Sequence, residues 1–175
     1  NYVDLVVPNY VIKELYFDFF GEILRRDSQY DINMTEIRNS MENISEKGDI
    51  TKFIKIVTTT LNGLSKRDFI KFDEKCVKLV MLTYFSMSRI YYVKSEYEVE
   101  GGFIDIALLP RPGVNVPYNA IFEVKYIKKK EFSKRLLDEK VLEAKQQIAR
   151  YVDSPELAQM DNLLKWVFVF CGEKL

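Results

Sequence analysis

Two neighbouring segments in the second half of the chain combine charged residues with the alternating pattern of β-strands. The first reads Glu100-Gly-Gly-Phe-Ile-Asp105 and continues into an apolar run, and the second, residues 120–127, contains Glu123-Val-Lys125. Successive side chains of a strand point to opposite faces, so Glu123 and Lys125 point the same way. If the two strands pair as a hairpin, Asp105 joins them, and two carboxylates and one ammonium meet on one face.

The apolar neighbours of Asp105 predict that its strand has a core face on the side opposite the carboxylate. Asp105 shares strand parity with Ala107, which leaves the other face to Ile104, Ile106 and Leu108. Taking unpaired charges out of water is expensive, and a divalent cation would make such a charged cluster tolerable. We therefore interpret the cluster as a site of chemistry rather than as scaffolding.

The chemistry that suits this cluster is hydrolysis of a phosphodiester. Asp105 and Glu123 would hold one or two Mg²⁺ ions, which lower the pKa of a bound water molecule and stabilise charge in the transition state. Lys125 would orient the attacking water or neutralise developing charge. Glu74 lies on an apolar face of a predicted helix and could contact the metal, and Gln147 lies at the edge of another helix's apolar stripe and could lean over the site.

Composition narrows the classes of function. The 175 residues include no histidine, which excludes Ser-His-Asp and Cys-His catalysis and His-ligated zinc. Any metal must then be held by oxygen ligands, which favours Mg²⁺ or Mn²⁺. Cys76 and Cys171 lie far apart in apolar runs, which indicates a reduced, cytoplasmic chain. No apolar stretch of about 18 residues is present, so we expect no membrane span.

Charge is balanced overall but not evenly distributed. Lysine and arginine together number 26, as do aspartate and glutamate, so a global basic signature for nucleic acid is absent. The basic run Lys128-Lys129-Lys130 follows the Glu-x-Lys strand directly. Such a run is either a solvated surface or a track for phosphates, and both interpretations remain open from the sequence.

Hydrophobic periodicity predicts an α/β core preceded by helices. Residues 1–66 are predicted to form a helical appendage or linker from an upstream domain, and residues 67–175 the main domain. In the main domain the order is helix, three strands, helix, strand, which indicates a mixed sheet. The first helix is apolar almost all round and is expected to be buried, and the last strand is expected to be buried on both faces. The predicted helices are 11–24, 35–44, 51–61, 69–90 and 132–152. The predicted strands are 91–99, a strand that has Asp105 near its start and ends at about residue 109, 119–127 and 166–171.

The candidate residues, in their order and spacing, resemble the PD-(D/E)XK nuclease superfamily. The resemblance covers about residues 69–171 and rests on Glu74, Gly102-x-x-Asp105, Glu123-x-Lys125 and Gln147-Ile-x-x-Tyr151. More narrowly, the chain resembles the C-terminal nuclease-like domain found behind an AAA-ATPase-like domain in bacterial proteins. The segment Tyr2-x-x-Asp-Leu-x-x-Pro8-Asn9 is similar to the junction that follows the ATPase portion in that family.

This resemblance implies a fold and a role for each matching position. The fold is restriction-endonuclease-like, with an α-β-β-β-α-β core and a mixed central sheet flanked by helices. The metal ligands of the family fall on Asp105 and Glu123, its catalytic lysine on Lys125, its helix-borne acid on Glu74 and its helix glutamine on Gln147. A metal set of Asp105, Glu123 and Glu74 follows from these positions.

We therefore expect a Mg²⁺- or Mn²⁺-dependent nuclease domain that acts on DNA, in a bacterial cytoplasmic protein with an upstream ATPase-like domain. Lys128, Lys129 and Lys130 are the expected nucleic-acid contacts. Two alternatives stay open: a catalytically inert nuclease-like module that binds nucleic acid or regulates the attached ATPase, and a structure-specific RNA nuclease. Nothing in the sequence distinguishes DNA from RNA.

Overall fold

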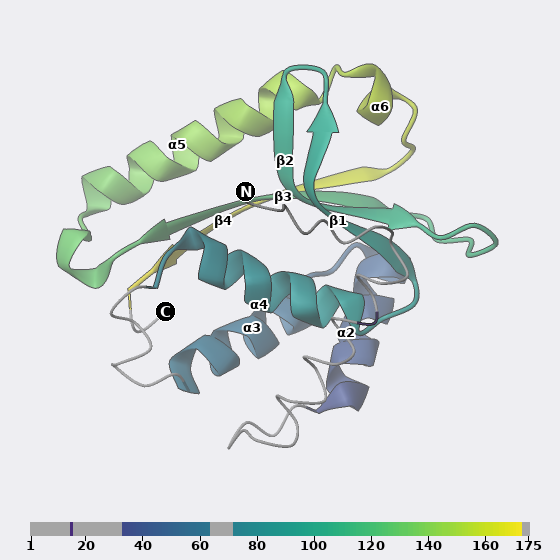
Figure 1. The fold of residues 1–175 in the computed structure, drawn as a ribbon, viewed down its shortest axis with the longest axis horizontal. Coiled ribbons are helices and arrows are strands. Elements are labelled where there is room, and N and C mark those ends of the chain that lie inside the picture. Colours follow the sequence, from purple (N-terminus) through teal and green to yellow (C-terminus); the bar gives the residue numbers. More distant parts are fainter. Residues whose placement is uncertain (1–14, 16–32, 64–71, 173–175) are drawn as a thin grey trace, which may run out of the picture.

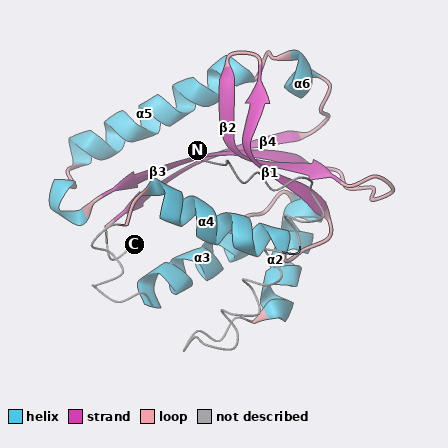
Figure 2. Cartoon of the chain, viewed as in Figure 1, coloured by secondary structure: helices cyan, strands magenta, loops and turns pink. Residues whose placement is uncertain are grey.

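The computed structural model describes residue 15, residues 33–63 and residues 72–172. The predicted helix 11–24, apart from residue 15, and the segment 2–9 lie outside this part of the chain. Figure 2 shows the helices and strands. In chain order they are α2 (Met34–Lys47), α3 (Thr51–Gly63), α4 (Glu74–Ser86), β1 (Tyr91–Val99), β2 (Gly102–Pro110), β3 (Asn119–Ile127), the short 3₁₀ helix η2 (Lys129–Glu131), α5 (Lys134–Tyr151), α6 (Pro155–Ala158) and β4 (Leu163–Cys171).

The four strands form one mixed sheet in the order β1-β2-β3-β4. The first three strands are antiparallel to their neighbours, and β4 runs parallel to β3. Helix α5 connects β3 to β4 and covers one face of the sheet, whereas α4 lies on the other face with α2 and α3 behind it (Figure 1). The predicted α-β-β-β-α-β core, its mixed sheet and the helices that precede it are confirmed. In the part of the chain that is described, no helix is long and apolar enough to cross a membrane.

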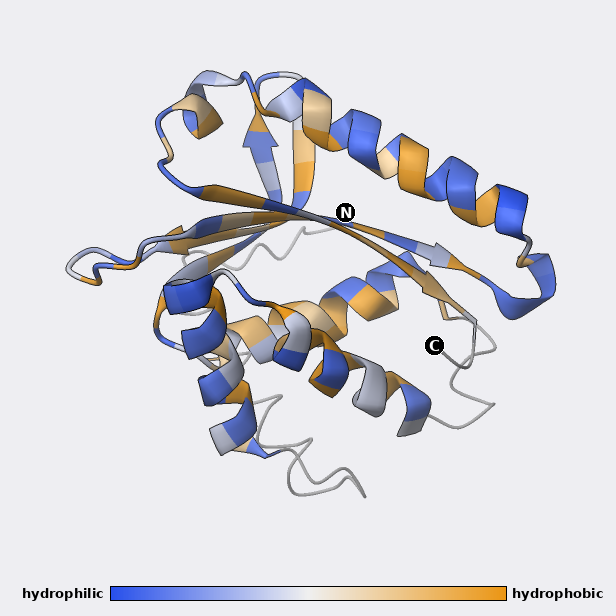
Figure 3. Cartoon of the chain, turned by 180° about the vertical axis from the view of Figure 1, so that it is seen from behind, coloured by the Kyte–Doolittle hydropathy of each residue, from blue (hydrophilic) through white to orange (hydrophobic). Residues whose placement is uncertain are grey.

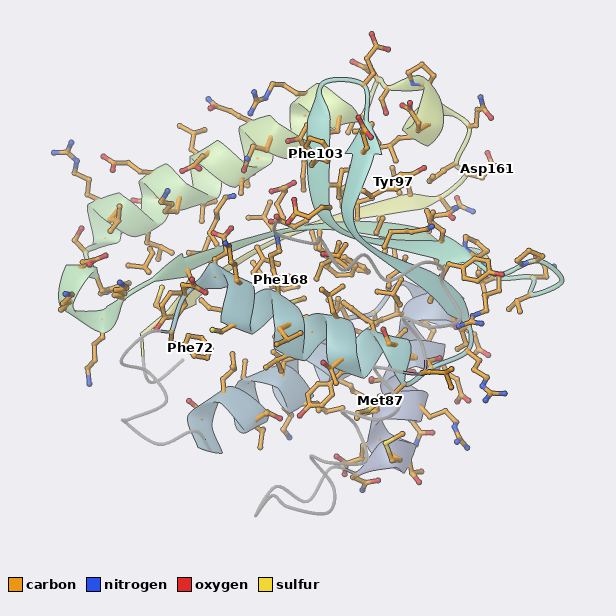
Figure 4. The ribbon with its side chains drawn as sticks, in the orientation of Figure 1. Phe72, Met87, Tyr97, Phe103, Asp161 and Phe168 are labelled. Atoms are coloured by element: carbon orange, nitrogen blue, oxygen red, sulfur yellow. The ribbon has the colours of Figure 1, made fainter. Side chains whose placement is uncertain are left out.

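Two hydrophobic clusters hold the layers together, one on each face of the sheet. The larger one joins α2, α3 and α4 to the sheet, and the smaller one lies between the sheet and the C-terminal parts of α5 and α6. Figure 3 shows apolar residues along the strands and as a stripe on α5. The larger cluster is centred on aromatic rings: Phe53 of α3 stacks on Phe85 of α4 with ring centroids 3.9 Å apart, and Phe85 packs against Phe122 of β3 at 5.1 Å. Phe168 of β4 lies between the sheet and α4 (Figure 4).

The helices begin and end where side chains satisfy their free backbone groups. The Asn33 side chain accepts hydrogen bonds from two amides in the first turn of α2, and Gly48 closes that helix in the left-handed conformation with φ of 65°. Asp73 caps α4 by accepting from the Cys76 amide, and Ser133 caps α5 by accepting from the Leu136 amide. These caps fix the helix boundaries better than hydrophobic periodicity does.

The expectation of a buried helix over residues 69–90 is wrong in extent and in burial. Asp73 has an extended backbone and starts the helix at Glu74, and the helix ends at Ser86. Residues 69–71 lie outside the described part. Leu79 is 58% exposed, whereas residues 81–85 are all buried, so α4 is buried on all sides only in its C-terminal half. The apolar composition of the helix therefore overstates its burial.

Two expectations about strand faces also need correction. β4 is only partly buried, because it forms the edge of the sheet and Lys165 faces solvent. Ile104 packs in the cluster on the α5 side, while Ile106 and Leu108 pack on the α4 side, so the three do not share one face. β1 is irregular opposite this point, since Glu96 has φ of 50° and is missing from the otherwise regular register between Ser95–Ile106 and Tyr97–Ile104.

The pairing of β2 with β3 is short, and this positions the site. Their register runs only from Leu108–Ala120 to Ile106–Phe122. Beyond that point the tip of the β1–β2 hairpin rises toward α6 and the end of α5, while β3 and β4 continue beneath α5 (Figure 1). The next two residues in register, Asp105 and Glu123, therefore lie where the two strands separate.

We predict that Phe53→Ala lowers the free energy of unfolding by about 3–5 kcal/mol, the usual cost of removing a buried phenylalanine. Phe53 is fully buried and stacks on Phe85, so its loss should weaken the whole core and not α3 alone. Denaturant unfolding followed by circular dichroism measures the change. Leu142→Ala is the control, because Leu142 is 58% exposed on α5 and its truncation should change stability by less than about 0.5 kcal/mol. An equally small effect of Phe53→Ala would contradict the shared core.

Candidate active site

Asp105 lies at the end of the β2–β3 ladder and has both carboxylate oxygens engaged. The side chain is largely buried, Oδ2 accepts a hydrogen bond of 2.8 Å from the Val124 amide of β3, and Oδ1 accepts one of 2.9 Å from Lys78 Nζ of α4. The carboxylate thus takes the place of a ladder hydrogen bond that β2 no longer supplies. Its position is fixed by the β3 backbone on one side and by a helix on the other.

Glu123 and Lys125 are buried in β3 on the face that α5 covers. Glu123 is 1% exposed and Lys125 is 7% exposed, and Lys125 Nζ lies 3.7 Å from Glu123 Oε2. The other oxygen, Oε1, is buried, and within the described residues no group makes a hydrogen bond to it. A buried carboxylate oxygen without a partner is costly, so this atom marks a place where a ligand would be stabilised.

The surroundings of Glu123 favour its protonated form. Burial, reinforced by the nearby Asp105 carboxylate, raises the pKa of Glu123 to about 8, although Lys125 opposes the shift. Without a nearby cation, the surroundings therefore disfavour the ionised form of Glu123. The raised pKa indicates that a nearby cation would stabilise the ionised Glu123 carboxylate.

Glu74 is the first residue of α4 and its side chain is half-buried. Burial raises the pKa of Glu74, Lys125 acts in the opposite direction, and Asp105 raises it further. The acid therefore interacts electrostatically with the cluster on β2 and β3, and it forms none of the salt bridges found in the described part of the chain. The structure thus brings Glu74 within electrostatic reach of Lys125 and Asp105.

Gln147 and Tyr151 of α5 lie over the same face of the sheet. The Oε1 atom of Gln147 is buried and has no hydrogen-bond partner among the described residues, whereas Gln146 is exposed. Tyr151 packs against Gly102 at the start of β2: a Cβ atom there would lie 3.1 Å from the ring, and φ of +145° disfavours any other residue. Gly102 thus lets α5 approach the strand that carries Asp105.

The basic run lies on the surface beside this site. Lys128, Lys129 and Lys130 are all exposed and follow β3 directly, at and within η2. They follow Lys125 by three to five residues, so the basic run begins where the strand that carries Lys125 ends. Their exposure leaves them available to a ligand.

Two residues that contact the cluster were missed by the sequence analysis. Lys78 of α4 forms salt bridges with Asp105 and with Glu96 of β1. The position of Lys78 carried a usable signal, because it is four residues after Glu74 and so lies on the same helix face. Glu96 carried none, because its inward contact depends on the irregular backbone of β1.

The oxygen donors of the candidate site fit a hard divalent cation, although Lys78 and Lys125 compensate much of the negative charge of these donors. In the part of the chain described, no group of three or more acidic, cysteine or histidine side chains is arranged to hold a metal ion. Asp105 and Glu123 nevertheless offer oxygen ligands of the kind that Mg²⁺ and Mn²⁺ prefer, and Glu123 Oε1, which no described residue engages, provides an unused bonding position. The residues present therefore fit such an ion.

The fold and this arrangement agree with the comparison to known protein families. The family model of the PD-(D/E)XK nuclease superfamily matches residues 72–175, which is more than half of the chain. The chain belongs to this superfamily, and its C-terminal part is a nuclease-like domain with a restriction-endonuclease-like fold. A search of the curated proteins found no match to the chain.

We predict that metal-free protein loses stability as pH rises, and that Glu123→Gln removes part of this loss. An unfolded glutamate titrates near 4.5 and folded Glu123 at about 8, so between these values the folded state holds the extra proton. The free energy of unfolding therefore falls as pH rises through this window and levels off above it. Urea unfolding in EDTA from pH 5 to 9 measures the slope. Glu143→Gln is the control, since Glu143 is exposed on α5; an identical slope for wild type and Glu123→Gln would contradict the prediction.

Proposed function

We propose that this domain is a metal-dependent phosphodiesterase that hydrolyses DNA with Mg²⁺ or Mn²⁺. The observation that carries the proposal is the Glu123 carboxylate, which is 1% exposed and lies 3.7 Å from Lys125, and one of whose oxygens has no hydrogen-bond partner within residues 33–63 and 72–172. A purely structural glutamate at such a depth would be expected to have its oxygens satisfied. Membership of the superfamily supplies the class of reaction.

In this proposal Asp105 and Glu123 would hold the metal, with Glu74 as a further acidic ligand. When bound, such an ion supplies an activated water at neutral pH and stabilises negative charge on the phosphate. Lys125 keeps an ammonium beside the ligands, where it can orient the water or neutralise charge that develops in the transition state. Gln147 offers a buried amide on the α5 side for the same region. The Val124 amide holds Asp105 in place throughout.

One observation favours the alternative of an inert module. Lys78 and Lys125 both form salt bridges with the candidate ligands, so the protein already balances part of the buried charge without a metal. An inert member of the superfamily would keep such pairs for stability and would bind nucleic acid, or regulate an attached domain, without cleaving. Cleavage assays on intact protein decide between the two functions.

The biological setting that we propose rests on the resemblance of the sequence. It comprises an upstream ATPase-like domain in a bacterial cytoplasmic protein, with residues 1–66 as an appendage or linker and residues 67–175 as the nuclease-like domain. RNA is the competing substrate. Assays should therefore offer duplex DNA, single-stranded DNA and RNA, and should include the protein with any upstream domain attached.

We predict that Lys125→Ala reduces Mg²⁺-dependent cleavage at least about 100-fold, because its ammonium would act on charge in the transition state. The expected substrate is DNA, and gel-resolved cleavage under single-turnover conditions measures the rate. Lys165→Ala is the matched control, because Lys165 is an exposed lysine on the neighbouring strand β4, and it should keep wild-type activity. Cleavage that survives Lys125→Ala would reject the assigned role. Binding without cleavage by wild type, with either metal and either nucleic acid, would favour the inert module.

We further predict that replacing Lys128, Lys129 and Lys130 by glutamine weakens DNA binding and flattens its salt dependence. Each lost phosphate contact should reduce the slope of log K against log salt by about 0.9, because fewer counterions are released. Fluorescence anisotropy from 50 to 200 mM salt measures this slope, in the range where such contacts matter. A control protein carries glutamine at three exposed lysines of α2 and α3, namely Lys47, Lys52 and Lys55. Equal slopes for the two triple variants would show that the run is only a solvated surface.

A further inference from the structure

Lys78 lies between two carboxylates of different strands and has no role in the function proposed above. Its ammonium is 2.9 Å from Asp105 Oδ1 and also contacts the Glu96 carboxylate. The Lys78 side chain is 11% exposed, as is that of Asp105, whereas that of Glu96 is 56% exposed. We refer to these three residues as the Lys78 bridge. The bridge connects α4, β2 and the edge strand β1.

The contact with Asp105 engages the only carboxylate oxygen that the backbone leaves available. Oδ2 is bound by the Val124 amide, so Oδ1 is the atom through which Asp105 would meet a cation most directly. In the described structure the Lys78 ammonium holds that atom. A lysine and a divalent cation that share one carboxylate repel each other, and this repulsion opposes binding of the cation.

The backbone of β1 is distorted at the residue that completes the bridge. Glu96 has φ of 50°, a left-handed conformation that is unfavourable for a glutamate, and β1 and β2 pair regularly on both sides of it. Glu96 thereby reaches a lysine that comes from α4. Because Glu96 is the more exposed partner, Lys78 has a second anion near the surface that would still compensate its charge if Asp105 were occupied.

The charge balance of the region leaves room for two positive charges. Among the described residues, four carboxyl groups, those of Glu74, Glu96, Asp105 and Glu123, lie in or beside the cluster, and Lys78 and Lys125 form salt bridges with three of them. With all groups ionised the sum is −2, which a divalent cation would neutralise. Without such an ion, Lys78 and Lys125 each compensate part of this negative charge.

We propose that Lys78 is a positioning residue that holds Asp105 in the absence of metal and competes with a divalent cation for it, and thereby sets the metal affinity of the site. This inference rests on the proposed function, since it takes Asp105 and Glu123 as the metal ligands. It gives α4 a task beyond packing. Lys78 keeps the ligand ordered before the ion binds, at the cost of weaker binding.

The test is direct measurement of Mn²⁺ binding by intact protein, using the electron paramagnetic resonance signal of free Mn²⁺. Lys78→Met should lower the dissociation constant about tenfold, since removing a single charge near a divalent ion has an effect of this size even at the dielectric of water. Lys78→Met should also melt at a lower temperature in EDTA, and Mn²⁺ should raise its melting temperature by more than it raises that of wild type. Lys75→Met is the matched control, because Lys75 is exposed on the same helix, and its affinity should stay near wild type. Unchanged or weaker Mn²⁺ binding by Lys78→Met would overturn the proposal.

A second variant keeps the test decisive if Lys78→Met does not fold. Lys78→Gln retains a hydrogen-bond donor near Asp105 without the charge, and it should also bind Mn²⁺ more tightly than wild type. A double-mutant cycle with Glu96→Asn then tests the bridge, because asparagine tolerates the left-handed backbone and lacks the charge. Glu96→Asn should weaken Mn²⁺ binding more in the wild-type background than in the Lys78 variant, whereas equal effects would mean that Glu96 does not act through Lys78.

The outcomes separate this inference from the proposed function. Asp105→Asn should abolish Mn²⁺ binding, and if it does not, the ligand assignment behind both proposals is wrong. If wild type binds Mn²⁺ through Asp105 and both Lys78 variants bind it equally well, only the inference fails. Mn²⁺ binding by the Lys78 variants but not by wild type would be the strongest support for the inference. Absence of Mn²⁺ binding by wild type and by every variant would reject the inference together with a metal-dependent function.

Discussion

The separation of β2 from β3 is the constraint on which the rest of the site depends. Their register ends at Ile106–Phe122, and the Asp105 carboxylate accepts the next available amide, that of Val124. A side chain in this position is held in the plane of the sheet. It can then be reached from both helix layers, which explains how a lysine of α4 contacts a cluster that also includes β3 residues on the α5 face. Regular pairing would have used the amide for the ladder and left the carboxylate on a single face.

These acids are buried without complete hydrogen bonding, so the requirements of stability and of function conflict at this site. Full hydrogen bonding of Glu123, or its replacement by an apolar residue, would stabilise the fold. Among the described residues, however, one of its oxygens has no hydrogen-bond partner, and burial raises its pKa to about 8. The neighbouring lysines lower this cost but do not remove it, since Lys125 is 3.7 Å away, beyond ordinary hydrogen-bond length. Buried polar groups with incomplete hydrogen bonding persist where a ligand or a reaction uses their free hydrogen-bonding capacity. The site is therefore an incompletely hydrogen-bonded part of a core that is otherwise built on packed apolar side chains.

The sequence predicted those parts of the fold and the candidate site that depend on regular repetition. The strands at Tyr91–Val99 and Asn119–Ile127 match the predicted bounds, and the contact of Glu123 with Lys125 follows from the strand period of two. Departures from regularity were not predictable in this way. The left-handed residue Glu96 breaks the period of β1, the Asp73 cap overrides the apolar run before α4, and the edge position of β4 depends on strand order. Lys78 was missed because its partners come from two strands that only the tertiary fold brings beside α4.

The N-terminal helices contribute to the geometry of the site although they carry none of its residues. Phe53 of α3 stacks on Phe85 of α4, which packs against Phe122, the residue directly before Glu123. The Thr60 hydroxyl also lies 2.6 Å from the Tyr84 hydroxyl and connects α3 to α4 a second time. Because packed aromatic rings resist sliding, these contacts fix α4 against β3. The acid and the lysine that α4 supplies are thereby held at a constant distance from the β3 carboxylate, and a change in α2 or α3 would reach the site through this contact.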